Sequence, residues 1–391
     1  MQRRQCIIAW CVLMACLMSA CQDKVTEVGV TATEIRMGQV CALTGPAQSL
    51  GKEMQEGATA YFAYINSQGG IHGRTLKLIT LDDGYEPDKT LEATKKLLDQ
   101  EKVFMLFGYV GTPTSLAVLP LVQARQVPFF GPFTGAESLR TPLLPNVYHV
   151  RASYFQETEA QVRELVDKLG KTKIAVFYQH DSFGQAGLEG AQQALRKRNL
   201  SVSATGTYER NTVDVQAAVD AITQAAPEAV VMVGAYKPSA AFIKATKAAG
   251  LKALFLNVSF VGSIPLAQEL GSDGDGVIVT QVVPLPWDSP LPLVAEYRSH
   301  MGLFMPRAPL GLGSLEGYVD AMILGRALQQ TGRQLTRAAL MKTLDSLSAA
   351  NFGGLFISFK PDNHQGSNTV YFSVIKEGRY KSILSLKALD L

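Results

Sequence analysis

The stretch VFMLFGYVGTPTSLAVLPLV, residues 103–122, indicates how this chain folds. An apolar run typical of a buried strand ends in glycines, and Thr112, Pro113, Thr114 and Ser115 then open a helical pattern. We predict that Thr112 caps this helix and that Pro113 takes its first position, where a missing N–H costs nothing. The free N–H groups of the first turn and the positive end of the helix dipole suit a carboxylate or another small anion. The alternative is that Thr112 only caps the helix.

A second turn of the same kind follows the next apolar run. It reads FGPFTGAESLR, residues 130–140, and again combines glycines and a threonine with the predicted start of a helix. Parallel α/β sheets bind ligands beyond the carboxyl ends of their strands, where the strand order reverses. Two such turns at neighbouring strand ends therefore favour a binding site.

From residue 33 onward, strand-like and helix-like segments alternate with short connections between them. The first strand EIRMGQV (residues 34–40) is followed by a helical pattern over residues 50–66, and the rhythm continues along the chain. Such alternation predicts parallel sheets covered by helices on both faces. One sheet of every strand would be unusually wide. We therefore expect an α/β fold with two doubly wound lobes joined by a hinge.

The lobe boundaries follow from two crossing segments. NVYHVRASYFQETEA, ending at residue 160, is the expected first crossing, and the Pro-rich VVPLPWDSPLPLV (residues 282–294) is the return. The closing strands, beginning with GLFISF at residues 354–359, are expected to complete the second lobe and the hinge. The predicted division is 33–152 with 283–352 for the first lobe and 153–282 with 353–391 for the second.

Residues 1–20 have the features of an export signal. Arg3 and Arg4 precede an apolar run, residues 7–18, that is too short to span a bilayer. The following LMSAC resembles a lipobox, in which Cys21 is lipidated and becomes the mature N-terminus, although Met18 stands where that motif prefers Leu. The expected location is therefore the periplasm, with a lipid anchor in the membrane. The alternative is an ordinary cleaved signal.

Composition limits the possible partners. With 47% hydrophobic and 18% charged residues the chain is an ordinary globular protein, and 391 residues suffice for two lobes that each bury a core. Without residues 1–20 it carries 35 basic and 34 acidic residues, which argues against a nucleic-acid partner. Of five cysteines only Cys41 remains beyond Cys21, so we expect a buried free thiol and no internal disulfide. We expect a monomer.

Catalytic signatures are absent from the sequence. The five histidines are scattered without metal-ligand spacing. In HDSFG, Asp181 stands where a nucleophile elbow requires glycine, and the paired acids of LDDG (residues 81–84) suit a capping turn better than acid–base catalysis. We therefore expect a binding protein that closes on a small ligand, without a metal or cofactor. The rival hypothesis is an amidase or esterase that uses Ser182 and His180.

These features together resemble the type I periplasmic binding proteins, specifically the leucine/isoleucine/valine receptor family of ABC transporters. The resemblance covers residues 33–391 and is carried, in matching order and spacing, by IRMGQVCALTGPAQSLGKEMQEGA, INSQGGIHGRTLKLITLDDGYEPDKT, FGYVGTPTS and VPFFGPFTGAESLR. It implies two lobes joined by three crossovers, a ligand in the cleft between them, and delivery of that ligand to a permease in the inner membrane.

The resemblance also implies a set of ligand-binding residues. Thr112 matches a hydroxyl that holds the ligand carboxylate, Tyr236 matches a second-lobe tyrosine, and Phe183 stands where these receptors often have a tyrosine. The turn after the second strand supplies further backbone and hydroxyl contacts. The implied positions are Leu50, Thr112, Phe133, Thr134, Gly135, Phe183, Tyr236 and Ser259.

Two of these positions depart from the family pattern. Ser259 falls where an amino-acid receptor places an acid against the ligand ammonium group, and Leu50 falls where an aromatic residue often packs on the ligand. A buried ammonium without a charged partner costs roughly several kcal/mol. Unless Asp181 or Glu316 substitutes, an apolar or aromatic ligand with a carboxylate or amide fits as well as an amino acid. The alternative function is a periplasmic shuttle or sensor for an aromatic or lipid-like compound.

Overall fold

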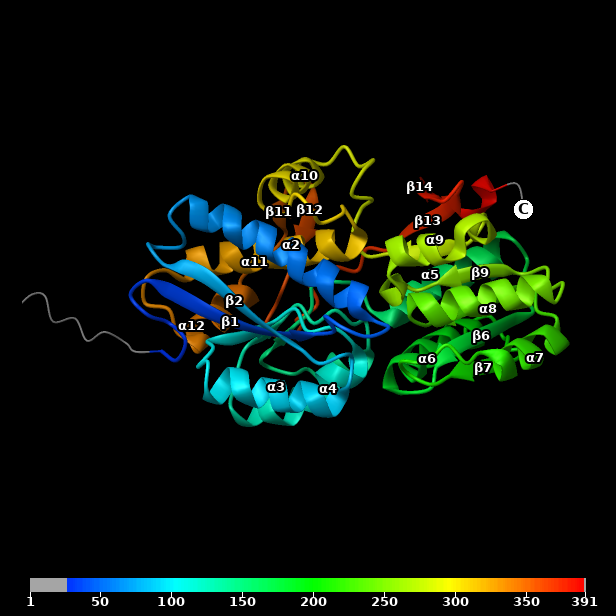
Figure 1. Ribbon diagram of the computed structural model, residues 1–391, viewed down its shortest axis with the longest axis horizontal. Coiled ribbons are helices and arrows are strands. Elements are labelled where there is room, and N and C mark those ends of the chain that lie inside the picture. The colour runs from blue at the N-terminus through cyan, green and yellow to red at the C-terminus, as the bar shows by residue number, and fades with distance from the viewer. Residues whose placement is uncertain (1–26, 390–391) are drawn as a thin grey trace, which may run out of the picture.

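Two apolar segments without an exposed residue, IAVFYQ and AVVMV, form strands β6 (Ile174–Gln179) and β8 (Ala229–Val233). Parallel strands covered on both faces are expected to be apolar along their whole length, and these two are buried throughout. The computed structural model describes residues 27–389, so the predicted signal and Cys21 lie outside the described part. In that part the chain folds into two α/β lobes, each built on its own sheet (Figure 1).

The smaller sheet belongs to the lobe that we call lobe I. All its neighbours pair in parallel, in the order β2-β1-β3-β4-β5. Because β2 and β3 lie on opposite sides of β1, the strand order reverses there, which is where such sheets place ligands. The strands are β1 (Glu34–Cys41), β2 (Thr75–Asp82), β3 (Met105–Phe107), β4 (Phe129–Phe130) and β5 (Val147–Tyr148).

The larger sheet belongs to lobe II. Its order is β14-β13-β10-β9-β8-β6-β7, with parallel pairing from β7 to β10 and antiparallel pairing of β13 with β10 and β14. The strands not yet bounded are β7 (Thr205–Tyr208), β9 (Leu254–Asn257), β10 (Ile278–Gln281), β13 (Tyr371–Lys376) and β14 (Arg379–Ile383).

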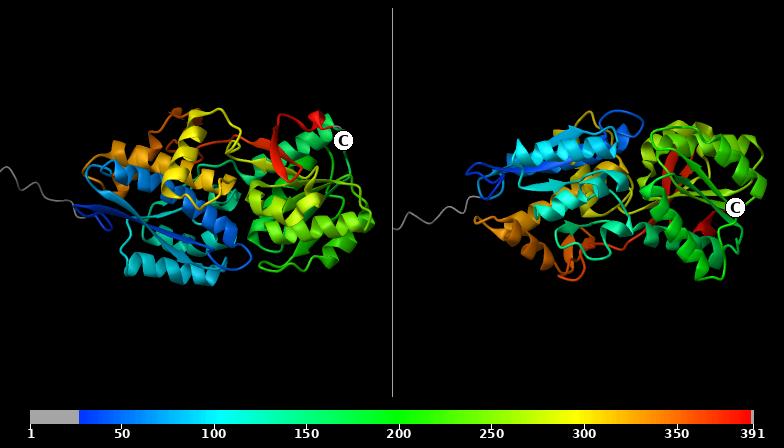
Figure 2. Two further views of the ribbon diagram at one scale, coloured as in Figure 1. Left: turned by 45° about the horizontal axis from the view of Figure 1, so that its top comes forward. Right: turned by 90° about the horizontal axis from the view of Figure 1, so that it is seen from below.

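Helices cover both faces of each sheet. In lobe I they are α2 (Gln48–Ser67), α3 (Pro87–Asp99), α4 (Thr112–Ala124), α10 (Pro292–Phe304), α11 (Leu312–Thr331) and α12 (Arg337–Asp345). In lobe II they are α5 (Tyr154–Val162), continued by a π-helical turn to Lys168, α6 (Ser182–Arg196), α7 (Gln216–Ala225), α8 (Tyr236–Ala248) and α9 (Ser263–Leu270). Figure 2 shows α2 with α10 and α11 on one face of the smaller sheet and α3 with α4 on the other.

Close packing of α2 against α11 fixes one wall of lobe I. A Cβ atom at Gly57 would lie 1.7 Å from the carbonyl oxygen of Ser314, so only glycine allows this approach. The helices carry Glu53 and Glu316, which therefore reach the same end of lobe I from two distant parts of the sequence.

The chain crosses between the lobes three times, after β5, after β10 and before β13. The predicted fold class, with two doubly wound lobes and a three-crossover hinge, is confirmed. One strand differs from the prediction: β12 (Leu355–Ile357) pairs with β11 (Ala350–Phe352) instead of joining the larger sheet. Phe359 then packs on Phe130 and Tyr148 of lobe I. Residues 353–359 therefore lie with lobe I, and the last crossing comes later than residue 353.

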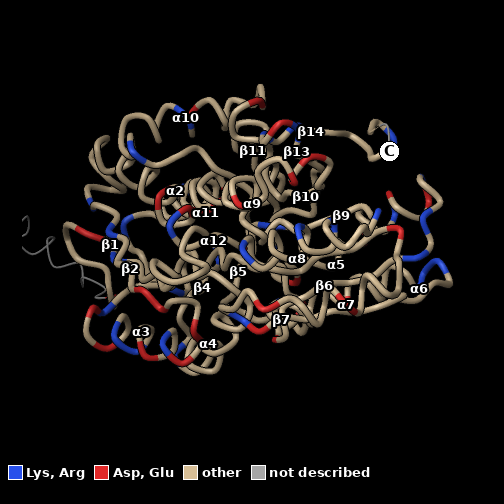
Figure 3. Tube along the Cα trace, turned by 45° about the vertical axis from the view of Figure 1, so that its right-hand side comes forward, with Lys and Arg blue, Asp and Glu red and all other residues tan. Residues whose placement is uncertain are grey.

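Surface charge is mixed over both lobes. Figure 3 shows basic and acidic positions interspersed, for example along α3, rather than gathered on one face. Within residues 27–389 none of the helices is both long and apolar enough to cross a membrane.

Candidate ligand-binding site between the lobes

Gly111 makes the turn from β3 into α4. Its φ of 109° lies in the region that favours glycine, and a Cβ atom there would lie 2.3 Å from the ring of Tyr85. Gly111 is consequently the N-cap residue and α4 begins at Thr112, so the prediction that the Thr112 side chain caps the helix is wrong. The Thr112 hydroxyl lies instead 2.6 Å from the hydroxyl of Thr134.

The two predicted turns lie side by side. Val110 and Phe133 form a parallel bridge, and the amide of Gly111 donates to the carbonyl of Phe133 at 3.2 Å. The second turn, however, leads only into a short 3-10 helix (Glu137–Leu139), so the predicted second helix start is wrong. Its Thr134 hydroxyl accepts from the Ala136 amide within the turn. Two buried hydroxyls and the first turn of α4 therefore meet at the end of the lobe I strands.

Gly135 connects this turn to the first crossing. Its carbonyl accepts a hydrogen bond from the amide of Tyr154 at 2.7 Å, at the start of α5. Ser153 and Gln156 form a capping box there, which fixes the direction in which α5 leaves the hinge. The Thr134 turn is thus attached directly to the first helix of lobe II.

Aromatic side chains fill the space between the lobes. Phe260 of lobe II, which is fully buried, lies with its ring centroid 5.6 Å from that of Phe133 and 6.1 Å from that of Tyr85, both in lobe I. Phe183 packs behind Phe260 at 4.5 Å. Phe133 and Phe183, both predicted site residues, are therefore brought together by a third aromatic residue.

Two other predicted residues, Leu50 and Tyr236, also lie at the contact between the lobes. The hydroxyl of Ser49, which precedes Leu50 on α2, lies 3.3 Å from that of Tyr236 at the start of α8. Leu50 is buried and faces Gly262, where an added Cβ would lie 2.7 Å from its side chain. Leu50 and Tyr236 thus contribute to the interlobe contact from opposite lobes.

Ser259 belongs to a buried polar cluster centred on Arg151. Its amide and hydroxyl both bond the carboxylate of Glu157, at 2.7 and 2.9 Å. Arg151 Nη2 donates to the Ser259 hydroxyl, and Arg151 Nη1 lies 3.5 Å from Glu316 Oε1. Glu316 is one of the two acids that could replace the acid missing at position 259. Arg151 lies between Glu316 and Ser259 and contacts both.

Asp181, the other such acid, is used elsewhere. Its carboxylate caps α6 by accepting from the Phe183 amide at 2.9 Å, and it accepts from Gln179 Nε2 at 2.6 Å. Arg210 Nη1 lies 3.3 Å from its second oxygen. These bonds of Asp181 are therefore made at the start of α6, and none of them involves a residue of the Ser259 cluster.

The remaining interlobe space is small. A cavity of about 10 Å³ is lined by residues of both lobes, and a volume of this size holds about one water molecule. A small organic molecule would fit there only if the lobes separated or side chains moved. The lining residues are Leu50, Glu53, Phe133, Ser259, Gly262, Ser263, Gln281, Val282, Val283, Leu312, Gly313 and Glu316.

Burial changes the protonation of the acids at this site. It raises the pKa of Glu53 to about 7, although the Gly313 amide donates to its carboxylate at 3.0 Å. It also raises the pKa of Glu316, which Arg151 partly offsets, and the pKa of Asp320 one helical turn further along α11. Loss of solvation disfavours the ionised form of each acid.

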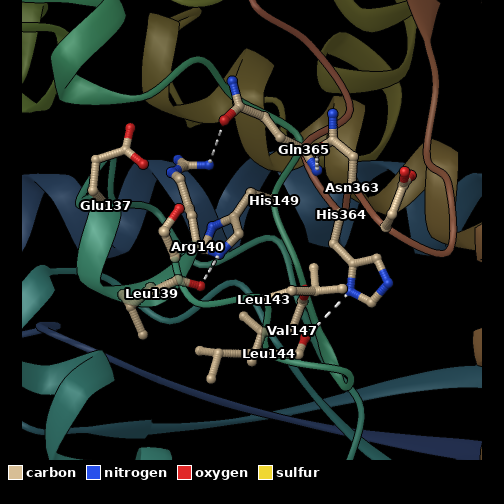
Figure 4. Close-up of a pocket in the computed structure, with 12 residues that line it drawn as sticks. Glu137, Leu139, Arg140, Leu143, Leu144, Val147, His149, Asn363, His364 and Gln365 are labelled. Carbon is tan, nitrogen blue, oxygen red and sulfur yellow. Dashed lines mark hydrogen bonds between the residues drawn. The ribbon is translucent and has the colours of Figure 1, made fainter.

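A larger cavity, about 320 Å³, lies beside the hinge (Figure 4). Arg140 in its wall donates through Nη2 to the carbonyl of Thr134 at 3.0 Å and through Nη1 to Gln365 at 3.5 Å. Gln365 donates in turn to Gln156 at the start of α5. The wall of this cavity therefore ties the Thr134 turn to the first and the last crossing segments.

The residues of the rival enzyme hypothesis are not assembled into a catalytic pair. His180 Nδ1 lies 2.7 Å from Glu209 Oε1, and both side chains are exposed. No hydrogen bond joins Ser182 to His180 among the described residues. Asp82 and Asp83 of LDDG bond neighbouring amides and hydroxyls, as a capping turn does. No group of three or more His, Cys, Asp or Glu residues in the 27–389 range could hold a metal ion.

The sequence reasoning missed the residues at the centre of the site. Arg151 and Phe260 come from the first crossing and from the loop after β9, and Tyr85 comes from the loop after β2. Arg151 carried a signal, because a single charged residue in the otherwise apolar start of a crossing segment needs a buried partner. Phe260 and Tyr85 carried none, since buried aromatic residues are common in any core.

Two doubly wound lobes, three crossings and one site between the lobes define a two-lobed binding protein. The chain belongs to the periplasmic binding protein family, which matches residues 34–379. It is 37% identical to a possible leucine/isoleucine/valine-binding protein from Rhodopirellula baltica, whose crystal structure aligns with a TM-score of 0.88 over 94% of this chain and 100% of that one.

Two further relatives agree with this assignment. A substrate-binding periplasmic protein from Ralstonia solanacearum is 27% identical, with a TM-score of 0.85 over 90% of this chain and 100% of that one. The Leu/Ile/Val-binding protein homolog 7 of Brucella suis is 26% identical over 231 residues, which are 56% of this chain and 57% of the Brucella protein. The match to this curated relative thus spans little more than half of its length.

Proposed function

We propose that this chain is a solute-binding receptor that captures a small, partly apolar ligand between its lobes and delivers it to an ABC importer. Membership of the periplasmic binding protein family supports this function. The observation that carries it is the pairing of the Thr112 and Thr134 hydroxyls, 2.6 Å apart at adjoining strand ends, opposite aromatic residues of lobe II. A polar ligand group would bind the hydroxyls, and an apolar part would pack on the aromatic rings.

The proposed ligand-binding residues are those that the sequence suggested. Thr112, Thr134 and Gly135 would hold the polar group, and Ser259 would border it from lobe II. The apolar contacts would come from Leu50, Phe133, Phe183 and Tyr236. The receptor would act in the periplasm as a monomer, held at the membrane by a lipid on Cys21, with an inner-membrane permease as its partner.

Native mass spectrometry of the protein purified without refolding would test the receptor function by detecting a co-purified small molecule. Calorimetry with that compound would then compare wild type with Thr112→Val, which removes one hydroxyl and nearly preserves shape. Loss of a hydrogen bond to a charged group costs about 1.5–3 kcal/mol, so we expect roughly ten- to hundredfold weaker binding.

Thr94→Val is the matched control. Thr94 is also fully buried and its hydroxyl lies 2.9 Å from that of Tyr109, but this pair lies between α3 and the end of β3 rather than between the lobes. The control should lose about as much stability as Thr112→Val and keep wild-type affinity. Equal affinity of both variants would place the ligand away from Thr112.

A further inference from the structure

Arg151 places a guanidinium group between the two lobes. It lies on the first crossing, is 2% exposed, and is the largest of the fully buried polar side chains described. Its Nη2 donates to Ser259 of lobe II and its Nη1 faces Glu316 of lobe I at 3.5 Å. Its Cζ lies 4.7 Å from the ring centroid of Phe133. A positive charge of the chain itself therefore borders the proposed ligand site.

This guanidinium has donors that the described residues leave unused. A guanidinium offers five N–H donors in a fixed plane. Among residues 27–389, Nε and Nη1 of Arg151 donate no hydrogen bond that meets normal geometry, although Nη1 lies 3.5 Å from Glu316 Oε1. Buried donors of a charged group are rarely left unpaired. Nε of Arg151 thus lacks an acceptor, which a bound carboxylate would provide.

The acids of the cluster are already engaged. Glu157 accepts from the Ser259 amide, the Ser259 hydroxyl and the Thr280 hydroxyl, the last at 2.6 Å. Glu316 faces Arg151, so a ligand ammonium group approaching it would stand next to a guanidinium of the same charge. Glu53 is the remaining acid in the cavity lining, and its carboxylate already accepts from the Gly313 amide.

We propose that Arg151 is a specificity-determining residue, and that the interlobe site takes a monocarboxylate without an α-ammonium group. The inference rests on the proposed receptor function and names its ligand class. Arg151 would pair with the carboxylate together with the Thr112 and Thr134 hydroxyls. Bidentate pairing of a guanidinium with a carboxylate is among the stronger polar contacts in proteins.

Matched compounds test the ligand class on the full chain. Calorimetry would compare 3-phenylpropanoate with L-phenylalanine, and 4-methylpentanoate with L-leucine, each pair sharing a hydrocarbon skeleton. We expect the monocarboxylate to bind at least about tenfold more tightly than its amino acid in any pair that binds, since one unfavourable charge contact is worth that much. Tighter binding of an amino acid would overturn the inference and point to Glu53 as the ammonium partner.

The role of Arg151 itself needs a variant that still folds. Arg151→Gln alone removes the counter-charge of both Glu316 and Glu157. The test variant therefore combines Arg151→Gln with Glu316→Gln, while Glu157 keeps its three hydrogen bonds from Ser259 and Thr280. The readout is the ratio of affinities for 3-phenylpropanoate and 3-phenylpropanamide, which a general loss of stability would not move. We expect this ratio to be about ten- to hundredfold lower in the double variant than in the single variant Glu316→Gln, which differs from it only at position 151.

Arg198→Gln is the matched control, because Arg198 is ion-paired with Glu159 and Asp167 within lobe II, outside the interlobe contacts. An unchanged ratio in the folded double variant would overturn the role of Arg151. If no monocarboxylate binds while native mass spectrometry shows another co-purified small molecule, the inference fails and the receptor function stands. If no compound binds and none co-purifies, both fail.

Discussion

The rim of the interlobe contact, which we define as Glu86 of lobe I with Arg210 and Asn211 of lobe II, gives a prediction that can be tested without knowing the ligand. Glu86 of lobe I accepts from two neighbouring residues of lobe II, Arg210 at 3.0 Å and Asn211 at 2.7 Å. Glu86 precedes α3 without a side-chain capping bond, so Glu86→Ala should affect the contact between the lobes more than either lobe itself. The Asn211 side chain also donates to the Gly84 carbonyl at 3.1 Å, and that bond would remain.

The expected size of the effect follows from exposure. The Arg210 and Glu86 side chains are 24% and 39% exposed, so their ion pair contributes about 0.5–1 kcal/mol. The hydrogen bond from Asn211 to the carboxylate adds about 1 kcal/mol. Glu86→Ala should therefore weaken the arrangement with the lobes in contact by about 1–2 kcal/mol, which changes the ratio of closed to open molecules roughly five- to thirtyfold.

Small-angle scattering would measure this shift as a larger radius of gyration. Asp99→Ala is the control, because Asp99 pairs with Arg125 within lobe I and its loss should leave the radius unchanged. The radius of gyration of the wild type in about 1 M salt should approach that of Glu86→Ala, since salt screens partly exposed charges. A radius that is the same for Glu86→Ala and Asp99→Ala at low salt would refute the reasoning that the rim holds the lobes together.

Two further predictions concern anchoring and pH. Cys21→Ser should move the protein from the membrane fraction to the soluble fraction on cell fractionation, and a wild-type protein that is already soluble with a free N-terminus would refute lipidation. Burial raises the pKa of Glu53 from 4.5 to about 7. The contribution of Glu53 to the free energy of unfolding is therefore full below about pH 4.5, and it is lost as the pH rises through 7. Urea unfolding between pH 4.5 and 8 should show this fall reduced by about 3 kcal/mol in Glu53→Gln, and equal pH dependence in both proteins would contradict it.

The alternation of strands and helices predicted the fold because buried parallel strands and their covering helices leave different periodic patterns. The same reasoning predicted that the Thr112 and Thr134 turns adjoin, since parallel strands end at one edge. It failed at the helix cap, because Gly111, whose positive φ and close approach to Tyr85 suit only glycine, takes the N-cap position. It also failed for β12, whose short apolar pattern cannot distinguish between β11 and the larger sheet as partner.

The centre of the site could not be predicted for a different reason. Arg151 meets Ser259 and Glu316, which are more than a hundred residues away along the chain, because the first crossing passes between a loop of lobe II and helix α11 of lobe I. A single sequence records each of these residues but not their distance. The structure therefore shows one feature that the sequence did not predict, the position of the positively charged Arg151 beside the proposed ligand site.

The burial of Cys41 has a practical consequence. This thiol is fully buried, its sulfur lies 3.6 Å from the Gly51 carbonyl, and burial raises its pKa well above the ordinary value. No other cysteine occurs among residues 27–389, so a soluble form of the chain that lacks Cys21 would offer no reactive thiol to a maleimide dye. One cysteine introduced at the rim would then carry an environment-sensitive fluorophore alone, and movement of the lobes would become an optical signal for screening compound libraries.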